Sequence, residues 1–473
     1  METKLNYKRT FLIGLAFLSI CSFWQMYDNI IPLILQNTYH LGETMTGAVM
    51  ALDNVLAIFL LPVFGTLSDK VHTKLGRRMP FIVSGTILAV IFMMLLPMID
   101  NAEKARWGTV ESFSNQVIFL AVLFFTLVSM GLYRSPAVAL MPDVTPNHLR
   151  SRANAVINLM GAVGGVYALI MIKVLVGKGE TPDYLPLFAS IAAVMAIAVG
   201  ILVMTIRENK LREEVEKAEA AIAETIEEKA MAEGVEAVGE IEAVGDTGAV
   251  KASDGKKQTG KTEGTKGMPK EVKRSMYFML ASIFLWFTAY NAVTTAFSRY
   301  TKVVWKMEGG SFANCLMVAT VAAIFSYIPI GSISAKIGRK KTIMGGVLLM
   351  AACYGAAIFA REYHPIVNVA FALIGVAWAA INVNSYPMIV AMSSGSDVGK
   401  FTGTYYTFSM AAQIFTPLLS GVLIDKAGLG YRVLFPYAVV FSLLSLCTIS
   451  QVKHGDSKPL PKKDKLEAFD VGD

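Results

Sequence analysis

The sequence is poor in charged residues and rich in apolar ones. Asp, Glu, Lys and Arg make up 17% of its 473 residues, whereas a soluble domain of ordinary composition carries about 25%. Residues of the set AVILMFWYC make up 54%, and the mean hydropathy is +0.51. This composition excludes a soluble enzyme, a disordered protein and a nucleic-acid-binding domain, although the formal net charge is +7. The apolar fraction, about 255 residues, is enough for about a dozen membrane spans of about 20 residues each.

Histidine and cysteine are also scarce, with five and four residues. The histidines fall at or beyond the ends of the apolar stretches, so the spans offer no histidine relay, nucleophile–base pair or metal-ligand cluster. We therefore predict neither an enzyme nor a resident cofactor or metal. The cysteines lie inside apolar stretches without ligand-like spacing, which predicts small buried side chains rather than disulfides or metal ligands. They are Cys21, Cys315, Cys353 and Cys447.

Apolar runs separated by short polar breaks predict twelve spanning helices. The first run is too long for the core of a signal peptide and no small-residue cleavage site follows it, so we expect it to remain as a span. The predicted spans are 9–37, 44–69, 80–98, 115–141, 152–176, 185–206, 273–301, 309–335, 342–360, 365–393, 399–424 and 430–452.

Lys and Arg are concentrated in every second short loop. Lys8 and Arg9 precede the first span, Arg77 and Arg78 follow the second, and Arg339 follows the eighth, whereas the loop after the first span has no Lys or Arg. Because cytoplasmic loops carry an excess of these residues, this pattern predicts that both termini are cytoplasmic. We expect a multi-pass protein of the cell membrane.

The longest polar break runs from residue 207 to residue 272. It begins with an Ala-, Glu- and Lys-rich stretch that predicts a solvated helix, and residues 234–268 are rich in Gly, Thr and Lys, as in a flexible linker. Nearly half of all Asp and Glu residues lie in this break. A plain tether is the simplest interpretation, with a regulatory or lipid-contacting role as the alternative. The predicted domains are a six-helix bundle (1–206), the cytoplasmic linker (207–272), a second six-helix bundle (273–453) and a cytoplasmic tail (454–473).

The two halves of the chain repeat one loop pattern. Gly65 and Asp69 close the second span and Arg77 follows in the loop, while Gly338 and Arg339 stand at the equivalent place after the eighth span. Internal repeats of this kind build transporters that rock about a central site. An Asp and an Arg at such a turn can lock two helix ends together in one conformation and release them in another. The predicted gating set is Gly65, Asp69, Arg77, Arg78, Arg134, Asp143, Arg152, Gly338 and Arg339.

This doubled loop resembles that of the major facilitator superfamily. Four extra residues between the Asp69-Lys70 pair and Gly76-Arg77, followed by Pro80-Phe81, look like the plant-type sucrose transporters, their animal proton–sugar relatives and the glycoside–pentoside–hexuronide cation symporters. The blocks Ser135-Pro136-Ala137 and Asn384-Ser385-Tyr386-Pro387 are similar to the fourth-to-fifth-span loop and the tenth span of this branch. The resemblance implies an all-α membrane protein of the major facilitator fold, with twelve transmembrane helices in two pseudo-symmetric six-helix bundles, commonly working as a monomer.

The acids that couple ions in two relatives are not at their usual places. The fourth-span acid of the sucrose transporters would fall near Leu127, and the second-span acids of melibiose-type sodium symporters near Ala57 and Leu61. Asp28 and Asp53 instead lie in the first and second spans, each about 13 Å from the outer helix end at about 1.5 Å per residue. Ionisable groups inside spans are usually functional, and two neighbouring carboxylates cannot both be charged cheaply. We predict that they couple an ion; the alternative is that they only position neighbouring helix groups.

Polar and aromatic side chains form stripes at helical spacing on five spans. Such groups can bind the hydroxyls and the apolar face of a sugar, whereas the alternative is that they pack helices together. Arg134, in the fourth span, is placed by preference in the gating set rather than in the cavity. Lys173, Arg299 and Lys302 are expected to snorkel at outer helix ends. The predicted substrate set is Trp24, Asp28, Asn29, Asn54, Asn154, Asn158, Trp286, Tyr290, Asn291, Trp378, Asn382, Tyr386, Tyr406 and Gln413.

Together these features predict a secondary transporter that carries a di- or oligosaccharide or a glycoside with a proton by alternating access. The expected partners are the sugar, the coupling proton and the lipid bilayer, without nucleic acid. Two alternatives stay open. One is efflux or facilitated passage of sugars or other small metabolites, and the other is a sodium-coupled glycoside symporter.

Overall fold

The structure is a computed structural model that describes residues 5–106, 113–146, 149–179, 181–232, 269–392 and 398–456. Twelve of its helices are long and apolar enough to cross a membrane, which confirms the predicted fold. The helices are α1 (Tyr7–Asn37), α2 (Glu43–Lys70), α3 (Met79–Ala105), α4 (Phe113–Asp143), α5 (Arg150–Leu175), α6 (Leu185–Thr205), α7 (Glu208–Ala232), α8 (Lys270–Val303), α9 (Ala313–Ile337), α10 (Arg339–Ile358), α11 (Val367–Val390), α12 (Val398–Asp425) and α13 (Leu434–Ser450), which a 3₁₀ turn (Tyr431–Val433) precedes.

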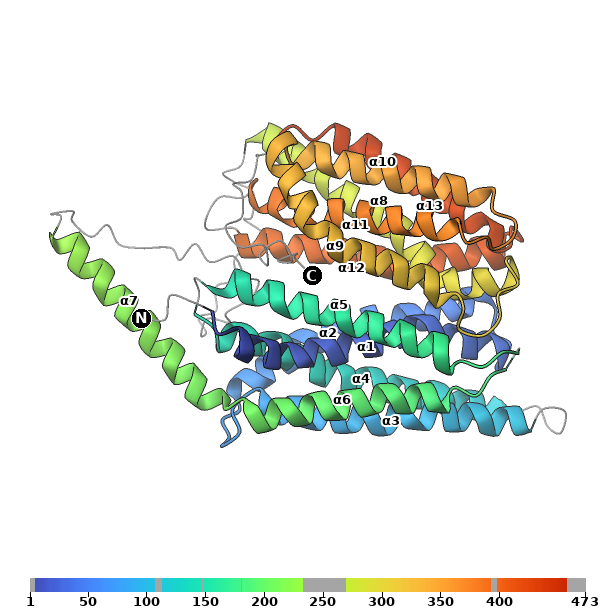
Figure 1. Cartoon of the computed structure of the whole chain (residues 1–473), viewed down its shortest axis with the longest axis horizontal. Helices are drawn as coiled ribbons and strands as arrows, with labels where there is room; N and C mark the ends of the chain where they lie inside the picture. The colour runs from blue at the N-terminus through green and yellow to red at the C-terminus, as the bar shows by residue number, and fades with distance from the viewer. Residues whose placement is uncertain are drawn as a thin grey trace, which may run out of the picture.

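The spanning helices form two bundles that lie against each other (Figure 1). Helices α1–α6 make the N-terminal bundle and α8–α13 the C-terminal bundle; α2 packs against α12, α5 against α9 and α1 against α8 across the interface. We call the end where α1 begins and α13 ends the terminal end, and the opposite end the distal end. Helix α7 leaves the N-terminal bundle at the terminal end and points away from it (Figure 1). Residues 233–268 of the predicted linker and 457–473 of the predicted tail lie outside the described residues.

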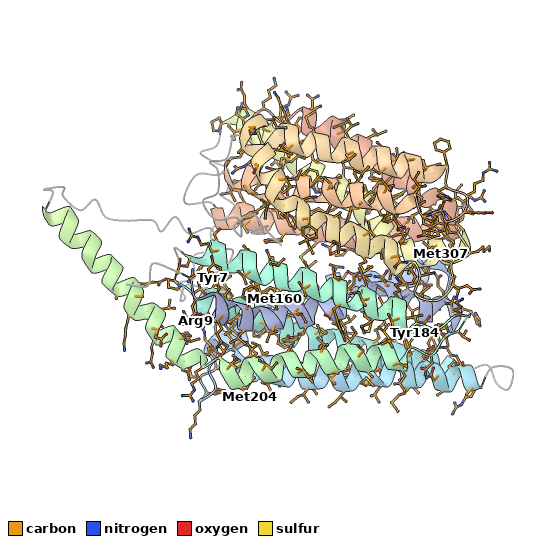
Figure 2. The ribbon with its side chains drawn as sticks, in the orientation of Figure 1. Tyr7, Arg9, Met160, Tyr184, Met204 and Met307 are labelled. Atoms are coloured by element: carbon orange, nitrogen blue, oxygen red, sulfur yellow. The ribbon has the colours of Figure 1, made fainter. Side chains whose placement is uncertain are left out.

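Large apolar side chains lie on the outer surfaces of both bundles. Phe59, Met204, Phe325 and Phe359 are all more than half exposed, and Met204 lies at the outer edge of α6 (Figure 2). In water such a surface would be unfavourable, whereas in a bilayer it faces lipid tails, and each helix satisfies its own backbone polar groups. The exposed apolar belt therefore fits a protein that crosses the membrane many times.

Helix α3 is longer than the sequence predicts. The predicted span ends at residue 98, because polar residues follow, but the helix continues to Ala105. The buried carboxylate of Asp100 accepts hydrogen bonds from Thr38 Oγ1 at 2.6 Å and from Lys104 Nζ at 2.5 Å. This pairing compensates the carboxylate for the loss of water, so the last turn of α3 can carry polar residues inside the protein.

The two bundles pack closely near the distal end, where α2 and α12 cross. A Cβ atom added at Gly47 would lie 2.2 Å from the carbonyl oxygen of Pro417, and one added at Gly421 would lie 2.7 Å from that of Glu43. Any larger residue at either position would push the helices apart. Small residues at helix crossings of this kind allow close backbone packing in membranes, and here they seal the distal end.

Candidate functional site

Two carboxylates from α1 and α2 meet at one depth of the N-terminal bundle. Asp28 lies nine residues before the end of α1, and Asp53 lies ten residues after the start of α2. Both positions are therefore about 13–15 Å from the distal helix ends, at about 1.5 Å per residue. The two side chains are half-buried and close enough to interact electrostatically. Asp53 Oδ1 also accepts hydrogen bonds from the backbone N–H of Asn54 at 2.6 Å and from its side-chain Nδ2 at 2.7 Å.

Arg134 joins this acid pair, which corrects its predicted place in the gate. Its guanidinium carbon lies 5.8 Å from the ring centroid of Trp24, and its charge acts on Asp53. The backbone of Arg134 lies on α4, nine residues before Asp143. Helix depth alone would therefore place its side chain near the residues predicted to gate. Its long side chain instead lies over the Trp24 ring of α1, where a cation–π contact stabilises it.

The C-terminal bundle places an aromatic stack on α8 and α11. The rings of Tyr290 and Trp378 lie 3.8 Å apart with an interplanar angle of 9°, and Phe287 meets Trp378 edge-on at 5.3 Å. Asn291 follows Tyr290 on α8 and is also half-buried. The structure thus brings together two members of the predicted substrate set that are 88 residues apart in the sequence.

Burial separates the predicted substrate set into two groups. Asn29, Trp286 and Tyr386 are buried, and Trp286 has no exposed surface at all. Asn29 Nδ2 donates to the carbonyl of Gln25, and Tyr386 hydroxyl bonds Thr402 Oγ1 at 3.0 Å between α11 and α12. Asn29 is thus bonded within α1, Tyr386 links α11 to α12, and Trp286 is enclosed in the core of α8. The half-buried members are Trp24, Asp28, Asn54, Asn154, Asn158, Tyr290, Asn291, Trp378, Asn382, Tyr406 and Gln413.

Several polar atoms near these residues are buried without a hydrogen-bond partner among the described residues. They include Trp24 Nε1, Tyr27 hydroxyl and Asn29 Oδ1 on α1, and Asn291 Nδ2 on α8. Each unsatisfied buried polar group costs about 1–3 kcal/mol. A ligand with several hydroxyl groups, or water, would satisfy such donors and acceptors. The arrangement therefore has the chemistry of a polar ligand site flanked by aromatic rings.

The residues predicted to form a gate at the terminal end make an ion-pair network. Arg77 and Arg78 both contact Asp143, with the shortest distances 2.7 Å from Arg77 Nη2 and 2.9 Å from Arg78 Nε. Both also reach Asp69, and Arg78 Nη1 donates to the carbonyl of Gly65 at 3.2 Å. The network ties the end of α2 to the end of α4 through the loop between α2 and α3. The structure therefore groups five of the residues predicted to gate; Arg152 is half-buried at the start of α5.

Glu208 of α7 holds the same loop, a role that the sequence motifs did not predict. Its fully buried carboxylate accepts hydrogen bonds from the backbone N–H groups of Arg77, Arg78 and Met79 at 2.9–3.0 Å. A carboxylate at a helix N-terminus satisfies unpaired N–H groups and the helix dipole. Gly76 has φ = +124°, and a Cβ there would collide with Glu208. The signal in the sequence that could have indicated this contact is an acidic residue directly after the sixth span, near a basic loop.

Arg77 is held in its charged form by this acidic surround. Burial disfavours the charged form, but the hydrogen-bonded carboxylate of Asp143, together with Asp69 and Glu208, outweighs burial and raises the pKa of Arg77 above its ordinary value. The guanidinium therefore keeps its charge, and the network can be broken by removing or protonating the carboxylates rather than by deprotonating the arginine.

The second copy of the loop uses a different acid. Gly338 has φ = +95°, and Arg339 Nη1 donates to the carbonyl of Pro387 at 3.3 Å. Asp456 Oδ1 accepts the backbone N–H of Lys340 at 3.0 Å, and its charge acts on Arg339. The position equivalent to Asp69 is Ala335, so an acid beyond α13 takes the place of one at the helix end.

A buried ion pair joins the two bundles at the distal end. Arg299 Nε lies 2.6 Å from Glu43 Oε1, and its Nη2 lies 3.2 Å from Oε2, with both side chains less than a tenth exposed. Tyr431 hydroxyl donates to Gln36 at 2.8 Å and also contacts Glu43. Arg299 was predicted to snorkel toward water; the structure instead pairs it with Glu43, because the opposite bundle covers it. We call Gln36, Glu43, Arg299 and Tyr431 the distal clamp.

Comparison with known proteins places these features in context. A family model described as the Major Facilitator Superfamily matches residues 12–327 and 305–470. Sucrose transport protein SUT3 of Oryza sativa subsp. japonica is 26% identical over 137 residues, 27% of each chain, and SUC4 of Arabidopsis thaliana is 34% identical over 116 residues, 23% of this chain and 22% of the relative. An uncharacterized symporter of Synechocystis is 24% identical over 144 residues, 29% of this chain and 25% of the relative. The matched segment spans about a quarter of the length of these relatives.

Solved structures share the fold at low sequence identity. The nucleoside transporter NupG aligns with a TM-score of 0.64 at 12% identity, over 94% of this chain and 100% of that chain. The xylose transporter XylE from E. coli, in an inward open conformation, aligns with a TM-score of 0.59 at 13% identity, over 93% of this chain and 94% of that chain. At this identity the similarity establishes the twelve-helix architecture alone.

Proposed function

Because the chain belongs to the Major Facilitator Superfamily, and is therefore a multi-pass membrane transporter of small molecules and not an enzyme, we propose that it carries a sugar together with a proton. The proposed substrate is a di- or oligosaccharide or a glycoside. The similarity of one segment to sucrose transport proteins supports a sugar as the substrate. The observation that carries the proposal is the acid pair Asp28–Asp53, with half-buried aromatic and amide side chains on helices of both bundles.

The sugar would bind between the acid pair and the aromatic stack. The Trp378 face, already stacked on Tyr290, offers a flat apolar surface for the C–H face of a pyranose ring. Asn291 and Trp24 provide N–H donors without a partner among the described residues, and the carboxylates provide acceptors. Hydroxyl groups of a sugar are both donors and acceptors, so they match such a mixed lining better than an ionic or wholly apolar substrate does.

The proton would be taken up by the carboxylates, with Arg134 as their fixed counter-charge. With both acids ionised, Asp28, Asp53 and Arg134 together carry a charge of −1, and binding one proton brings this group to zero. Moving a neutral group between the two sides is less costly than moving a charged one. This charge count gives a physical reason for a proton and a sugar to travel together.

Alternating access would use the distal clamp and the gate at the terminal end. In this structure the distal clamp joins the bundles, so the form described here is closed at the distal end. The basic loops at the terminal end support a cytoplasmic location for that end and for both termini. The distal end then faces outside, and we propose that the protein works as a monomer in the plasma membrane.

Uptake into proteoliposomes tests this function. The purified protein would be reconstituted and offered radiolabelled mono- and disaccharides and glycosides, with an inward proton gradient, an inward sodium gradient or no gradient. Accumulation of at least one sugar under the proton gradient alone is expected. Accumulation under sodium alone would favour a sodium-coupled glycoside symporter, and equilibration without accumulation would favour facilitated passage. No transport of any sugar would refute the proposal.

A further inference from the structure

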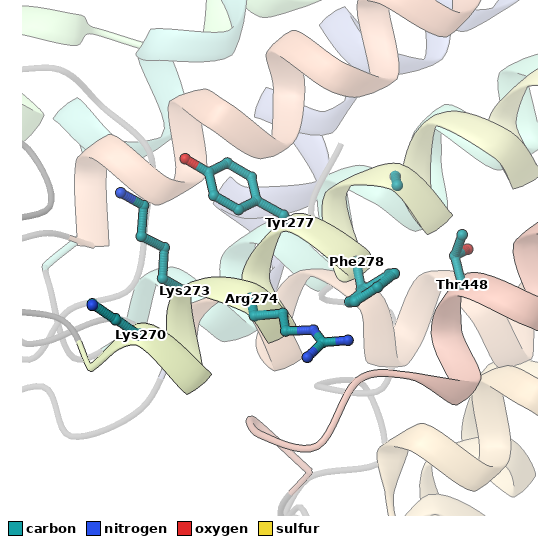
Figure 3. Close-up of a pocket in the computed structure, with 7 residues that line it drawn as sticks. Lys270, Lys273, Arg274, Tyr277, Phe278 and Thr448 are labelled. Atoms are coloured by element: carbon teal, nitrogen blue, oxygen red, sulfur yellow. The ribbon is translucent and has the colours of Figure 1, made fainter.

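A hollow lies between α8 and α13 at the terminal end, away from the acid pair and the gate. It has a volume of about 490 Å³, within the usual range of about 300–1,000 Å³ for small-molecule sites. In Figure 3, Arg274 and Phe278 of α8 extend on the side of Thr448 of α13, whereas Lys270, Lys273 and Tyr277 extend on the other side of α8. Its lining residues are Lys270, Lys273, Arg274, Tyr277, Phe278, Ala281 and Thr448.

The hollow combines a cationic mouth with an apolar floor. Lys270 lies three and four residues before Lys273 and Arg274, so all three cations lie within about one turn at the start of α8. Lys273 Nζ lies 5.9 Å from the Tyr277 ring centroid, and the Arg274 guanidinium carbon lies 5.7 Å from that of Phe278. These contacts direct the cations along the aromatic rings.

One acid stands nearby, but the mouth remains cationic. Glu271 is exposed on the first turn of α8 and is not among the lining residues, so the first two turns keep a net charge of +2. Ser275, buried on α8, bonds the segment after α13, because its hydroxyl bonds His454 Nδ1 at 2.8 Å and accepts the backbone N–H of Lys453 at 3.2 Å. The chain after α13 is thereby held against α8.

The outer face of α13 indicates that the hollow opens toward lipid. Leu443, Leu444 and Cys447 precede Thr448 and are exposed, although the sequence predicted a buried Cys447. Helix α13 packs on α8 and α10 of its own bundle. An apolar face at this depth lies against acyl chains, while the basic mouth lies at the helix start, where headgroups are found. Basic pockets between transmembrane helices bind anionic headgroups.

We propose that this hollow binds an anionic phospholipid of the surrounding leaflet. The headgroup phosphate contacts Lys270, Lys273 and Arg274, and the upper part of one acyl chain lies along Phe278 and Ala281. The assignment does not depend on sugar transport, since none of these residues belongs to the acid pair, the aromatic stack or the gates.

Native mass spectrometry of the full-length protein tests the assignment with phosphatidylglycerol and phosphatidylcholine as probes. Wild-type protein should retain phosphatidylglycerol in preference to phosphatidylcholine, and K270Q/R274Q should lower that preference by about fivefold per charge removed. The matched control is K336Q/K341Q, which removes two exposed lysines from α9 and α10 at the same end and should leave the preference unchanged. Equal loss in both double variants, or none in either, would overturn the proposal.

A second variant separates a lipid from a free phosphate anion. Ala281→Trp fills the apolar floor and leaves every basic residue in place, so it should also reduce retention of phosphatidylglycerol. Free glycerol phosphate, which has no acyl chain, should not displace the bound lipid at equal concentration. Unchanged retention by Ala281→Trp, or displacement by glycerol phosphate, would show an anion site without a lipid component and would overturn the proposal.

Discussion

The carboxylate of Glu43 on α2 and the guanidinium of Arg299 on α8 form a two-point ion pair that joins the bundles across 256 residues of sequence. Removing one partner of a buried pair leaves an uncompensated charge and costs about 3–5 kcal/mol. Glu43→Gln should therefore shift the protein away from the form closed at the distal end. Spin labels at Met45 and Lys426, exposed on α2 and just after α12, should move apart by double electron–electron resonance.

The surface pair Lys178–Glu308 supplies the control for this prediction. It also links the two bundles at the distal end, but both side chains are mostly exposed and 3.8 Å apart. Exposed pairs contribute about 0–1 kcal/mol, so Lys178→Gln should leave the label distance as in the wild type. If Glu43→Gln behaves in the same way as Lys178→Gln, the distal clamp is not what holds this end closed.

Removing the Glu208 carboxylate should destabilise the loop between α2 and α3. Three backbone N–H groups lose their acceptor, and the free energy of unfolding should fall by at least about 2 kcal/mol. Glu208→Ala should therefore lower the thermal midpoint and speed hydrogen exchange over residues 71–80, with Glu208→Gln in between. Glu216→Gln, an exposed acid on the same helix, is the control; equal effects of Glu208→Ala and Glu216→Gln would contradict the capping role.

The two arginines of the proposed gate should differ in their effect on transport. The Arg78 side chain is 6% exposed and contacts Asp143, Asp69 and the Gly65 carbonyl, whereas that of Arg77 is 20% exposed. Arg78→Ala should reduce the initial uptake rate about tenfold more than Arg77→Ala, since a buried charge-assisted contact is worth about 1.5–3 kcal/mol. Initial uptake rates in proteoliposomes, corrected for protein content, measure the difference between the two variants. A larger loss for Arg77→Ala would reverse the assignment.

Substitutions of two tryptophans of the predicted substrate set should have different effects, one on sugar binding and the other on thermal stability. Trp378→Ala removes the stacking surface and should raise KM about two- to tenfold, since an aromatic contact is worth about 0.5–1.5 kcal/mol, with little change in thermal midpoint. Trp286→Ala removes a fully buried side chain and should lower the thermal midpoint, leaving KM near the wild-type value. If KM changes only in Trp286→Ala, the aromatic stack is not the sugar surface.

The sequence predicted the features that depend on local pattern. Apolar runs predicted all twelve spans, and the spacing from Asp69 to Arg78 predicted that these residues lie together at the terminal end, where the structure pairs them. Their role as a gate stays a prediction. The acid pair was also predicted, because two acids at one depth of neighbouring helices stand out against an apolar background. Sugar binding and ion coupling by these residues stay predictions.

Contacts between distant segments could not be predicted in the same way. From sequence alone, Arg299 has the pattern of a residue that snorkels toward water, because nothing shows that α2 covers it. Its partner Glu43 has the pattern of an ordinary acidic residue in the first turn of a helix. Asp456 and Glu208 lie outside the spans, so their pairing with loops depends on how the chain returns to the bundles. Trp286 follows the same helical stripe as Tyr290, and only the packing of α8 shows that one is core and the other half-buried.

Coupling of the proton to the sugar through Asp28 is the central claim, and sugar-induced proton movement measures it directly. Addition of a transported sugar to lightly buffered proteoliposomes should make the outside medium alkaline with wild-type protein. With Asp28→Asn the pH change should vanish, while exchange of labelled for unlabelled sugar continues, because the sugar surface remains but the proton acceptor is lost. A pH change of wild-type size in Asp28→Asn would contradict the account.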